Sequence, residues 1–248
     1  MYSDIGIVIL AAGLGTRMKS NKAKVLHKIC GKPMIEYVVQ TATHVVGSNI
    51  VVVVGHQAEE VKRAVDCVGT VKYALQKEQL GTGHAAQCAL PLIDEDIKDI
   101  IILCGDVPLI RSTTIERLIG AHKGGKHDVS LLAVTVDDPK GYGRIILDAS
   151  GNLSAIVEEA DANELQKKIN IINTGIYAVR RDYLESALPK LRAENAQKEI
   201  YLTDIIGIGY EQGRSIGICI GNDSSEIIGV NSQNELQLAE KLVNARKI

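Results

Sequence analysis

The chain has 248 residues and a formal net charge of -2, and 46% of its residues are hydrophobic. This hydrophobic content excludes a disordered chain and is ample for one large α/β domain. The sequence contains no Phe and no Trp, so its core must be built mainly from aliphatic side chains. Because the chain has neither a basic excess nor many aromatic residues for base stacking, nucleic acid is a poor candidate partner.

The cysteines number five, and no two of them form a C-x-x-C pair. An odd number at wide spacing argues against a disulfide framework or a structural zinc site and favours a reducing compartment. No signal peptide is visible, and no apolar run approaches the roughly 20 residues that span a membrane. We therefore expect a cytoplasmic protein without a membrane partner.

Strands and helical segments alternate through the first half of the chain. The predicted strands are Ile5–Leu10, Ile50–Val54, Val71–Leu75 and Ile100–Leu103. The predicted helices are one that begins after Pro33, one at Gln57–Val65, and one at Thr113–His122 with Thr113 and Glu116 as a capping box. The alternation indicates βαβ units with right-handed crossovers, and short β-branched runs are typical of buried parallel strands.

The second half of the chain is richer in predicted strands. Its elements are a strand at Val129–Val136, a hairpin of Arg144–Leu147 and Leu153–Val157, a strand at Ile171–Val179 that Gly175 interrupts, a helix at Tyr201–Tyr210, a strand at Ser215–Ile220, and a last helix toward Arg246 capped by Ser232 and Glu235. No repeat or linker divides the chain, so we expect a single domain over residues 1–248, split only loosely near residue 106. The pattern predicts an α/β fold with a Rossmann-like, mostly parallel sheet flanked by helices and a small β-rich lobe.

A glycine-rich turn follows the first strand and leads into a strongly basic segment. The small residues of Ala11–Thr16 let a ligand approach the backbone, and successive N–H groups in such a turn can form an anion nest. No Asp or Glu occurs between Ile5 and Ile35. The basic residues here are Arg17, Lys19, Lys22, Lys24, Lys28 and Lys32. This concentration of positive charge beside a glycine loop predicts a site for several phosphates.

Other interpretations of this segment explain less. A G-x-G-x-x-G dinucleotide fingerprint needs a third small residue where Met18 stands. A P-loop is excluded because Pro33 follows Gly31-Lys32 and Leu26 occupies the position of the first glycine. A tight strand-to-helix turn beside a solvated lysine face accounts for glycines and charges separately, but not for their presence in one short segment.

The run Leu10–Met18, LAAGLGTRM, resembles the signature of the sugar-1-phosphate nucleotidyltransferases, and Lys24 follows it after a short spacer. Ala23 stands where that family usually has proline. More narrowly, the chain is similar to the N-acetylglucosamine-1-phosphate uridylyltransferases, the pyrophosphorylase half of a bifunctional bacterial enzyme. The resemblance implies a glycosyltransferase-A-like fold with a nucleotide-binding half at 1–106 and a sugar-binding half at 107–248. It assigns nucleotide contacts to Leu10, Ala11, Ala12 and Gly13.

The block Gln76–Ala85 resembles the segment that reads uracil in this family. Gln76 has an amide donor and a carbonyl acceptor, which suit the imide edge of the base. Gly81 and Thr82 offer backbone groups at close range. The alternative is a glycine before a helix with Gln76 on the surface. His84 belongs to the same block, and we assign it no chemistry.

Asp106 follows the predicted strand Ile100–Leu103, at the strand end where open α/β sheets hold ligands. Mg²⁺ prefers carboxylate and phosphate oxygens, and the resemblance implies that Asp106 holds Mg²⁺ together with Asn231 of the motif Gly229–Ser232. An ordinary turn aspartate and an ordinary loop before a helix are the alternatives. Cys104 stands where the family commonly has tyrosine, and nothing in the sequence marks it as an activated nucleophile.

Three motifs of the second half resemble the sugar-binding segments of the family: G-Y-G-R-I, I-V-E-x-x-D-A and I-N-T-G-I. They assign Gly143, Glu158 and Asn173 to the sugar, together with Asn231. Each motif is weak alone, and the resemblance depends on their order and spacing. We expect Glu199–Asp204 to cap the following helix and to shape the sugar pocket.

The resemblance implies uridylyl transfer from UTP to N-acetylglucosamine 1-phosphate, giving pyrophosphate and UDP-N-acetylglucosamine, a cell-envelope precursor. It implies that Arg17 stabilises the departing pyrophosphate, that Lys24 contacts the reacting phosphates, and that Mg²⁺ is the cofactor. The ionised sugar phosphate is the nucleophile, so no general base is required. Transfer with another nucleotide or sugar 1-phosphate, and a binding module without turnover, are the alternatives. We expect no left-handed β-helix acetyltransferase domain, because the sequence has no hexapeptide repeats; it leaves the oligomeric state open.

Overall fold

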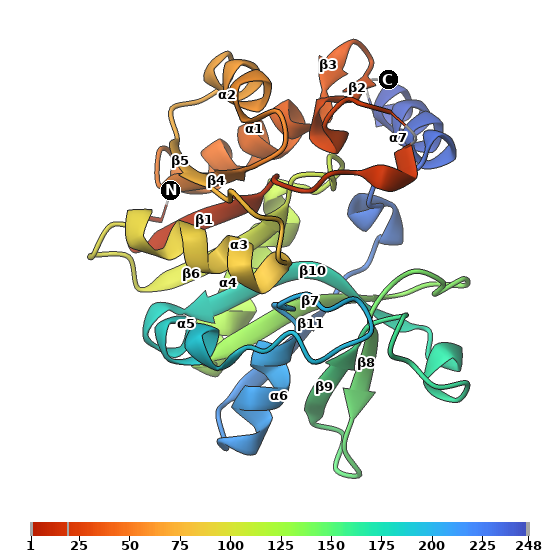
Figure 1. The fold of residues 1–248 in the computed structure, drawn as a ribbon. Helices are drawn as coiled ribbons and strands as arrows, with labels where there is room; N and C mark the ends of the chain where they lie inside the picture. The colour runs from red at the N-terminus through yellow and green to blue at the C-terminus, as the bar shows by residue number, and fades with distance from the viewer. Residues whose placement is uncertain (1, 19, 247–248) are drawn as a thin grey trace.

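The computed structural model describes residues 2–18 and 20–246, and a mixed β-sheet lies at its centre (Figure 1). Nine strands of the described residues form this sheet, in the order β11-β7-β10-β6-β1-β4-β5, with β8 paired to β10 and β9 to β8. The strands are β1 (Ile5–Leu10), β4 (Ile50–Val54), β5 (Lys72–Leu75), β6 (Asp99–Cys104), β7 (Val129–Thr135), β8 (Arg144–Leu147), β9 (Leu153–Val157), β10 (Ile171–Arg180) and β11 (Ile216–Ile220). Along the central path β10 alone runs against its neighbours. The predicted α/β fold with a mostly parallel sheet is therefore confirmed.

Helices cover both faces of the sheet. They are α1 (Met34–Val46), α2 (Ala58–Asp66), α3 (Thr82–Ala89), α4 (Ser112–Gly125), α5 (Arg181–Ala187), α6 (Asp204–Glu211) and α7 (Gln233–Arg246). Side chains of α1, α2 and α4 pack in one apolar cluster with Ile5, Ile7 and Ile9, whereas α3, α5 and α6 pack in a second cluster with Val8. Successive side chains of a strand point to opposite faces. Strand β1 therefore packs against apolar clusters on both of its faces. Because both faces are buried, the strand has no polar residue.

The predicted hairpin forms the small β-rich lobe, which lies apart from the main path of the sheet (Figure 1). Strand β8 is joined to β10 through the pair Arg144–Ile172. The side chain of Arg144 is 1% exposed, forms an ion pair of 2.6 Å with Glu159, and donates to the Lys167 carbonyl at 3.3 Å. This buried arginine ties the hairpin to the chain that follows β9.

Strand β10 carries a bulge at the position where Gly175 is predicted to interrupt it. Its register against β7 shifts between Asn173 and Tyr177, and Gly175 has φ +75°. A residue with a left-handed backbone breaks the regular ladder and favours glycine. The bulge places Asn173 beside β8, where its N–H donates to the Gly143 carbonyl at 2.8 Å.

The predicted capping box of Thr113 and Glu116 is wrong. Helix α4 begins at Ser112, and Arg111 precedes it as the N-cap without a side-chain capping bond. The neighbouring Thr114 hydroxyl instead donates to Glu226 at 2.5 Å, from a segment far along the chain. Thr113 and Glu116 therefore lie inside the helix rather than at its start. The helix also continues beyond the predicted end, to Gly125.

Three further elements differ from the prediction, and one predicted helix cap is confirmed. A short hairpin that the sequence does not predict, β2 (Lys28–Ile29) and β3 (Lys32–Pro33), packs against α7 (Figure 1). Helix α5 is also unpredicted, and α6 begins at Asp204 rather than Tyr201. The predicted cap of α7 is confirmed, since the Glu235 N–H donates to Ser232 Oγ at 3.3 Å.

All five cysteines are free thiols. Within residues 2–18 and 20–246, every helix is too short or too polar to cross a bilayer.

Candidate active site

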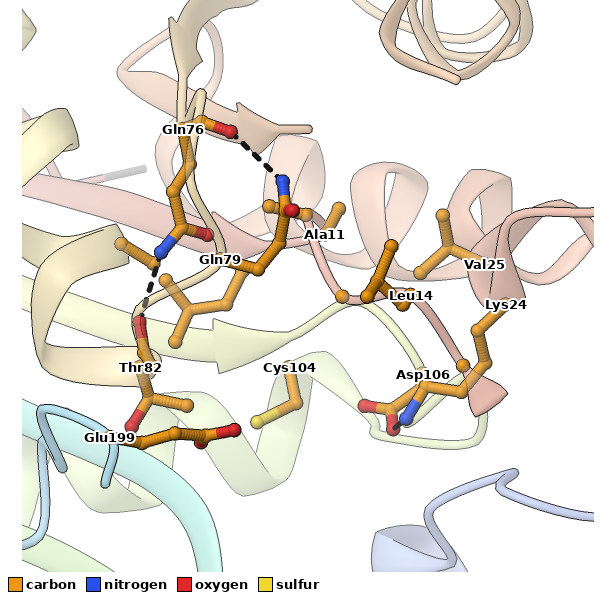
Figure 2. Close-up of a pocket in the computed structure, with 16 residues that line it drawn as sticks. Ala11, Leu14, Lys24, Val25, Gln76, Gln79, Thr82, Cys104, Asp106 and Glu199 are labelled. Atoms are coloured by element: carbon orange, nitrogen blue, oxygen red, sulfur yellow. Dashed lines mark hydrogen bonds and ion pairs between the residues drawn. The ribbon is translucent and has the colours of Figure 1, made fainter. Parts of the chain in front are cut away.

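A cavity of about 420 Å³ opens where β1, β5 and β6 end (Figure 2). Open α/β sheets hold their ligands at this carboxyl edge, and the volume suits a small-molecule ligand. Lys24 and Asp106 line this cavity. So do all the residues that the resemblance assigns to the nucleotide, which are Leu10, Ala11, Ala12, Gly13, Gln76, Gly81 and Thr82. The structure thus brings together segments that are far apart in the sequence.

The glycine-rich turn folds back on the segment that carries Lys24. Gly15 has φ +66°, and a Cβ at this position would stand 2.6 Å from the Cβ of Lys24. Only a residue without a side chain lets the two segments approach so closely. Gly13, by contrast, faces open space, with no atom within 4 Å of a Cβ built there. The turn therefore brings Lys24 to the cavity and leaves its own backbone accessible to a ligand.

Four polar side chains converge at one end of the cavity. Lys24 Nζ forms an ion pair with Asp106 (Figure 2) and lies 3.0 Å from Asn231 Oδ1. Arg17 Nη2 donates to the same Asn231 oxygen at 2.8 Å. Arg17 and Lys24 come from the basic segment, Asp106 follows β6, and Asn231 precedes α7. A cluster of two cations, one carboxylate and one amide oxygen is suited to binding phosphates and a cation together.

The donor set fits a hard divalent cation. Oxygens of Asp106 and Asn231 approach one positively charged group, the Lys24 ammonium, so both are directed at one point. No group of three or more His, Cys, Asp or Glu side chains within the described residues is placed to hold a metal. Mg²⁺ bound here would therefore complete its coordination with phosphate oxygens and water, as it commonly does.

The remaining basic residues of the segment do not join this cluster. Lys28 and Lys32 belong to the β2–β3 hairpin and are exposed, and Lys22 is also exposed. Lys19 lies outside the described residues. Of the basic residues of this segment that the structure describes, Arg17 and Lys24 alone contact Asp106 or Asn231, so fewer of them reach the cluster than the run of charges suggests.

Gln76 is fixed with one face toward the cavity. It is 3% exposed, and its Nε2 donates to the Gly81 carbonyl at 3.0 Å (Figure 2). A backbone carbonyl only accepts, so this bond sets the orientation of the amide. One of its two amide N–H donors is therefore engaged, Nε2 also lies 3.2 Å from His84 Nδ1, and the Gln76 oxygen is left as an acceptor. The sequence suggested that both groups of Gln76 would read the base.

The segment Glu199–Asp204 is fastened to the block that begins at Gln76. Ile200 N–H donates to the Leu80 carbonyl at 2.7 Å, Gly83 N–H donates to the Ile200 carbonyl at 2.8 Å, and Leu202 N–H donates to Thr82 Oγ1 at 3.0 Å. The expected capping role is wrong, because Thr203 precedes α6 without a side-chain capping bond. The segment supports one wall of the cavity, where Glu199 lines it, and its expected part in shaping a sugar pocket stays a prediction.

Three of the residues assigned to the sugar, Gly143, Glu158 and Asn173, lie together near β10, whereas Asn231 lies in the cluster with Arg17 and Lys24. Asn173 Oδ1 accepts from the Gly175 N–H at 3.0 Å and from the Tyr177 hydroxyl at 3.1 Å. These donors fix the amide so that its Nδ2 is turned away from them, and it makes no hydrogen bond to any described residue. A Cβ on Gly143 would stand 3.2 Å from Glu158 Oε1, so the carboxylate lies directly against this glycine.

Cys104 lies between the two groups of residues. It lines the cavity, and its Sγ lies 3.5 Å from the Gly175 carbonyl oxygen. Burial, together with the negative charge of Asp106, raises the pKa of Cys104 to about 12. The thiol therefore stays protonated at neutral pH and is a poor nucleophile, which agrees with the sequence interpretation.

The sequence analysis missed several residues that line the cavity. Gln79 Nε2 donates to the Gln76 carbonyl at 3.1 Å, and Leu14 and Val25 also line the cavity. Glu199 also reaches the cavity (Figure 2). Gln79 stands in the same block as Gln76, Leu14 in the glycine-rich turn, and Glu199 in the segment Glu199–Asp204, so each belongs to a motif that the sequence offered. That they line one cavity, together with Val25, depends on how distant segments fold together.

The fold and the site together define a class of protein. A mostly parallel sheet, a glycine turn at its carboxyl edge, and cations facing a carboxylate and an amide oxygen suit a protein that handles a nucleoside triphosphate and a divalent cation. Residues 7–194 match the family model described as the MobA-like NTP transferase domain.

Curated relatives place the chain more narrowly. It is 42% identical over 245 residues to a bifunctional protein GlmU of Desulfotalea psychrophila, covering 99% of this chain and 72% of the relative. The chain therefore belongs to the MobA-like NTP transferase family, and within it to the group of the bifunctional proteins GlmU. GlmU of Caldanaerobacter subterraneus is 49% identical over 242 residues, covering 96% of this chain and 51% of the relative. GlmU of Alkaliphilus oremlandii is 46% identical over 239 residues, covering 96% of this chain and 52% of the relative. The chain thus spans about half the length of most of these relatives.

A solved structure supports the fold. A putative glucose-1-phosphate thymidylyltransferase from Bacillus anthracis superposes with a TM-score of 0.72, over 96% of this chain and 94% of that one, at 19% identity. At this identity the likeness concerns the fold alone.

Proposed function

We propose that the protein transfers uridylyl from UTP to N-acetylglucosamine 1-phosphate, forming UDP-N-acetylglucosamine and pyrophosphate, with Mg²⁺ as its cofactor. The observation that carries the proposal is the meeting of Arg17, Lys24, Asp106 and Asn231 beside the cavity. A protein that only bound a nucleotide sugar would not need two cations and two cation ligands at one point.

Uracil is the base that the cavity suits best. Gln76 presents a carbonyl oxygen, because its amide nitrogen is directed at the Gly81 carbonyl and at His84 Nδ1. The imide N–H of uracil is a donor that this oxygen can accept, whereas the corresponding ring nitrogen of cytosine is an acceptor and would be left unpaired. A buried unpaired acceptor costs roughly 1–3 kcal/mol, so UTP is preferred over CTP.

The chain's own groups position two anions and neutralise charge. The phosphate of the sugar is already ionised at neutral pH, so it attacks the α-phosphorus of UTP without a general base, and pyrophosphate leaves on the opposite side. Lys24 contacts the reacting phosphates, and Arg17 neutralises charge on the departing pyrophosphate. Asp106 and Asn231 would hold Mg²⁺, which when bound supplies charge neutralisation and a template for the phosphates. Holding the reactants in line contributes the remainder of the acceleration.

The proposal for the base predicts a strong effect at Gly81. This residue has φ +113°, and a Cβ there would stand 2.5 Å from the Ile200 carbonyl oxygen. We expect Gly81→Ala to push the Gln76 block away from the cavity and to lower kcat/KM for UTP on the order of 10²-fold. Steady-state kinetics with varied UTP measures this.

Gly151→Ala is the matched control for Gly81→Ala. Gly151 also has a positive φ, +83°, but no atom lies within 4 Å of a Cβ built there. Both variants should lose roughly 1–3 kcal/mol of stability through backbone strain, while only Gly81→Ala should impair UTP use. Equal kinetic effects in the two variants would contradict the role of the Gly81 contact.

Glu158 gives the sugar site a pH dependence. Burial, with the nearby charges of Asp204 and Asp161, raises the pKa of Glu158 to about 6. We propose that its carboxylate accepts hydrogen bonds from sugar hydroxyls, so protonation removes acceptor capacity. The KM for N-acetylglucosamine 1-phosphate should therefore rise as the pH falls from about 7 to about 5, while the KM for UTP changes less.

Glu158→Gln separates this effect from the ionisation of the sugar phosphate itself. At neutral pH the variant should already have a raised KM for N-acetylglucosamine 1-phosphate. Its KM should then change with pH only through the ionisation of the sugar phosphate. Stability offers a second measurement: the folded pKa of Glu158 lies above its ordinary value of 4.5, so the ionised form is penalised at neutral pH. Glu158→Gln should thus raise Tm relative to the unmodified protein at pH 7 and not at low pH. A parallel pH dependence of KM in both proteins would count against the role of Glu158.

Magnesium-dependent pyrophosphate release tests the function as a whole. Purified protein is incubated with Mg²⁺ and UTP, with and without N-acetylglucosamine 1-phosphate, beside GTP, CTP and glucose 1-phosphate. We expect release only with UTP and the acetylated sugar. Release with another pair would keep the reaction and change the substrate, whereas UTP binding without any release would favour a binding module.

A further inference from the structure

The first turn of α7 holds the backbone of Asn231. The Asn231 N–H donates to Glu235 Oε2 at 2.8 Å, and the Ser232 hydroxyl donates to the same oxygen at 2.9 Å. Glu235 N–H in turn donates to Ser232 Oγ. Half-buried Glu235 thus does more than cap a helix, because one of its oxygens fixes the residue that faces Asp106 and Lys24.

The other side of the same loop is fastened to Asp106. Val230 N–H donates to the Asp106 carbonyl at 2.9 Å, and the Val230 side chain is fully buried in the apolar cluster under α7. Asn231 Nδ2 donates to the Gly229 carbonyl at 3.0 Å, which fixes the amide so that Oδ1 faces the cations. The backbone of the loop is therefore held at Asp106 through Val230 and at Glu235 through Asn231.

We propose that Glu235 is a positioning residue that sets the distance between the Asn231 and Asp106 oxygens and thereby the affinity of the site for a divalent cation. This inference rests on the proposed function, because it supposes a cation at these oxygens. Without the Glu235 carboxylate, the Asn231 N–H loses its acceptor. The backbone of the loop then keeps the Val230 bond to Asp106, and the Asn231 side chain keeps its bonds to Arg17 and Lys24. Asn231 Oδ1 then samples a wider range of positions relative to Asp106. Loss of a group that orients a metal ligand typically costs 10–100-fold in metal affinity or activity.

Two substitutions at Glu235 separate positioning from charge. Glu235→Ala removes both hydrogen bonds to Asn231 and Ser232. Glu235→Gln keeps a carbonyl oxygen that can accept both, and it removes the negative charge. Positioning therefore predicts loss in Glu235→Ala and rescue in Glu235→Gln.

Glu240→Ala is the matched control on the same helix. Glu240 Oε1 accepts from the Cys30 N–H at 2.8 Å and so fastens α7 to the β2–β3 hairpin, which lies beside it (Figure 1). This variant weakens the docking of α7 without removing a bond to Asn231. It reports what a general loss of helix stability does to the site.

The first measurement needs no ligand. Hydrogen–deuterium exchange followed by mass spectrometry, on a peptide that contains Val230 and Asn231, should show faster exchange in Glu235→Ala and near-normal exchange in Glu235→Gln and Glu240→Ala. The second measurement is the affinity for Mn²⁺ in the presence of UDP-N-acetylglucosamine, followed by the electron paramagnetic resonance signal of free Mn²⁺. We expect affinity 10–100-fold lower in Glu235→Ala alone, with a matching rise in the Mg²⁺ concentration needed for half-maximal pyrophosphate release.

The outcomes are distinguishable. If the unmodified protein releases no pyrophosphate and does not bind Mn²⁺, the proposed function fails. If it is active but Glu235→Ala binds Mn²⁺ as tightly, or if Glu240→Ala weakens Mn²⁺ binding equally, Glu235 has no positioning role and serves only the helix.

Discussion

Replacing Asp106 with alanine is expected to reduce magnesium-dependent pyrophosphate release on the order of 10³-fold or more, the largest effect in the molecule. Asp106 provides the carboxylate of the proposed cation site, and its partner oxygen on Asn231 is uncharged. An amide oxygen alone binds Mg²⁺ weakly, and metal ions supply several kcal/mol of charge stabilisation in reactions of this kind. Each 1.36 kcal/mol lost is a tenfold loss in rate.

Asp106→Asn separates the charge from the shape of the side chain. This variant keeps the size of Asp106 and one acceptor oxygen, yet it should be almost as slow as the alanine variant because the charge is gone. Asp138→Ala, an exposed aspartate in a turn outside the cavity, is the control and should keep full activity. Circular dichroism and thermal unfolding verify that each variant is folded. Substantial turnover of folded Asp106→Ala at ordinary Mg²⁺ would rule out this metal assignment.

Arg17→Ala is expected to lower kcat by roughly 10²–10³-fold while changing the KM for UTP less. The guanidinium lies at the open end of the cluster, 2.8 Å from Asn231 Oδ1, where a leaving pyrophosphate would develop charge. Loss of one preorganised donor to developing charge costs about this much in other enzymes. Arg17→Lys keeps the charge but not the planar pair of donors. Its kcat should therefore lie between those of Arg17→Ala and the unmodified protein.

The reverse reaction gives an independent measurement for Arg17. If the guanidinium binds pyrophosphate, Arg17→Ala should raise the KM for pyrophosphate when UDP-N-acetylglucosamine is converted back to UTP. Arg63→Ala, an arginine on α2 whose side chain is 74% exposed, is the control and should behave as the unmodified protein. An unchanged kcat and an unchanged KM for pyrophosphate in Arg17→Ala would remove this residue from the mechanism.

The regular strands could be predicted because their signals are local. Strand β1 and strand β4 are apolar at every position or nearly so, which is what burial on both faces requires. The turn at Gly151 between β8 and β9 and the cap of α7 are equally local. The start of α4 was predicted wrongly, because the helix begins at Ser112, before the expected capping residue Thr113.

The candidate site divides in the same way. The residue types of the glycine turn and the basic segment indicated phosphates, but charge alone did not select Arg17 and Lys24 from the exposed Lys28 and Lys32. That selection depends on Gly15, which lets Lys24 fold back toward Asp106. The hairpin β2–β3 was missed because strands of two residues carry almost no periodicity.

The sequence by itself determined the parallel α/β framework, the glycine turn at the end of β1 and the set of polar residues available for chemistry, because periodicity and turn residues act over a few positions. The tertiary structure alone decided which of those residues meet. Lys24, Asp106 and Asn231 are far apart in the sequence and meet only in the folded chain. The hydrogen bond that orients the Gln76 amide toward Gly81 also forms only in the fold. Contacts of this kind depend on how elements pack, and packing is a property of the whole chain rather than of any local segment.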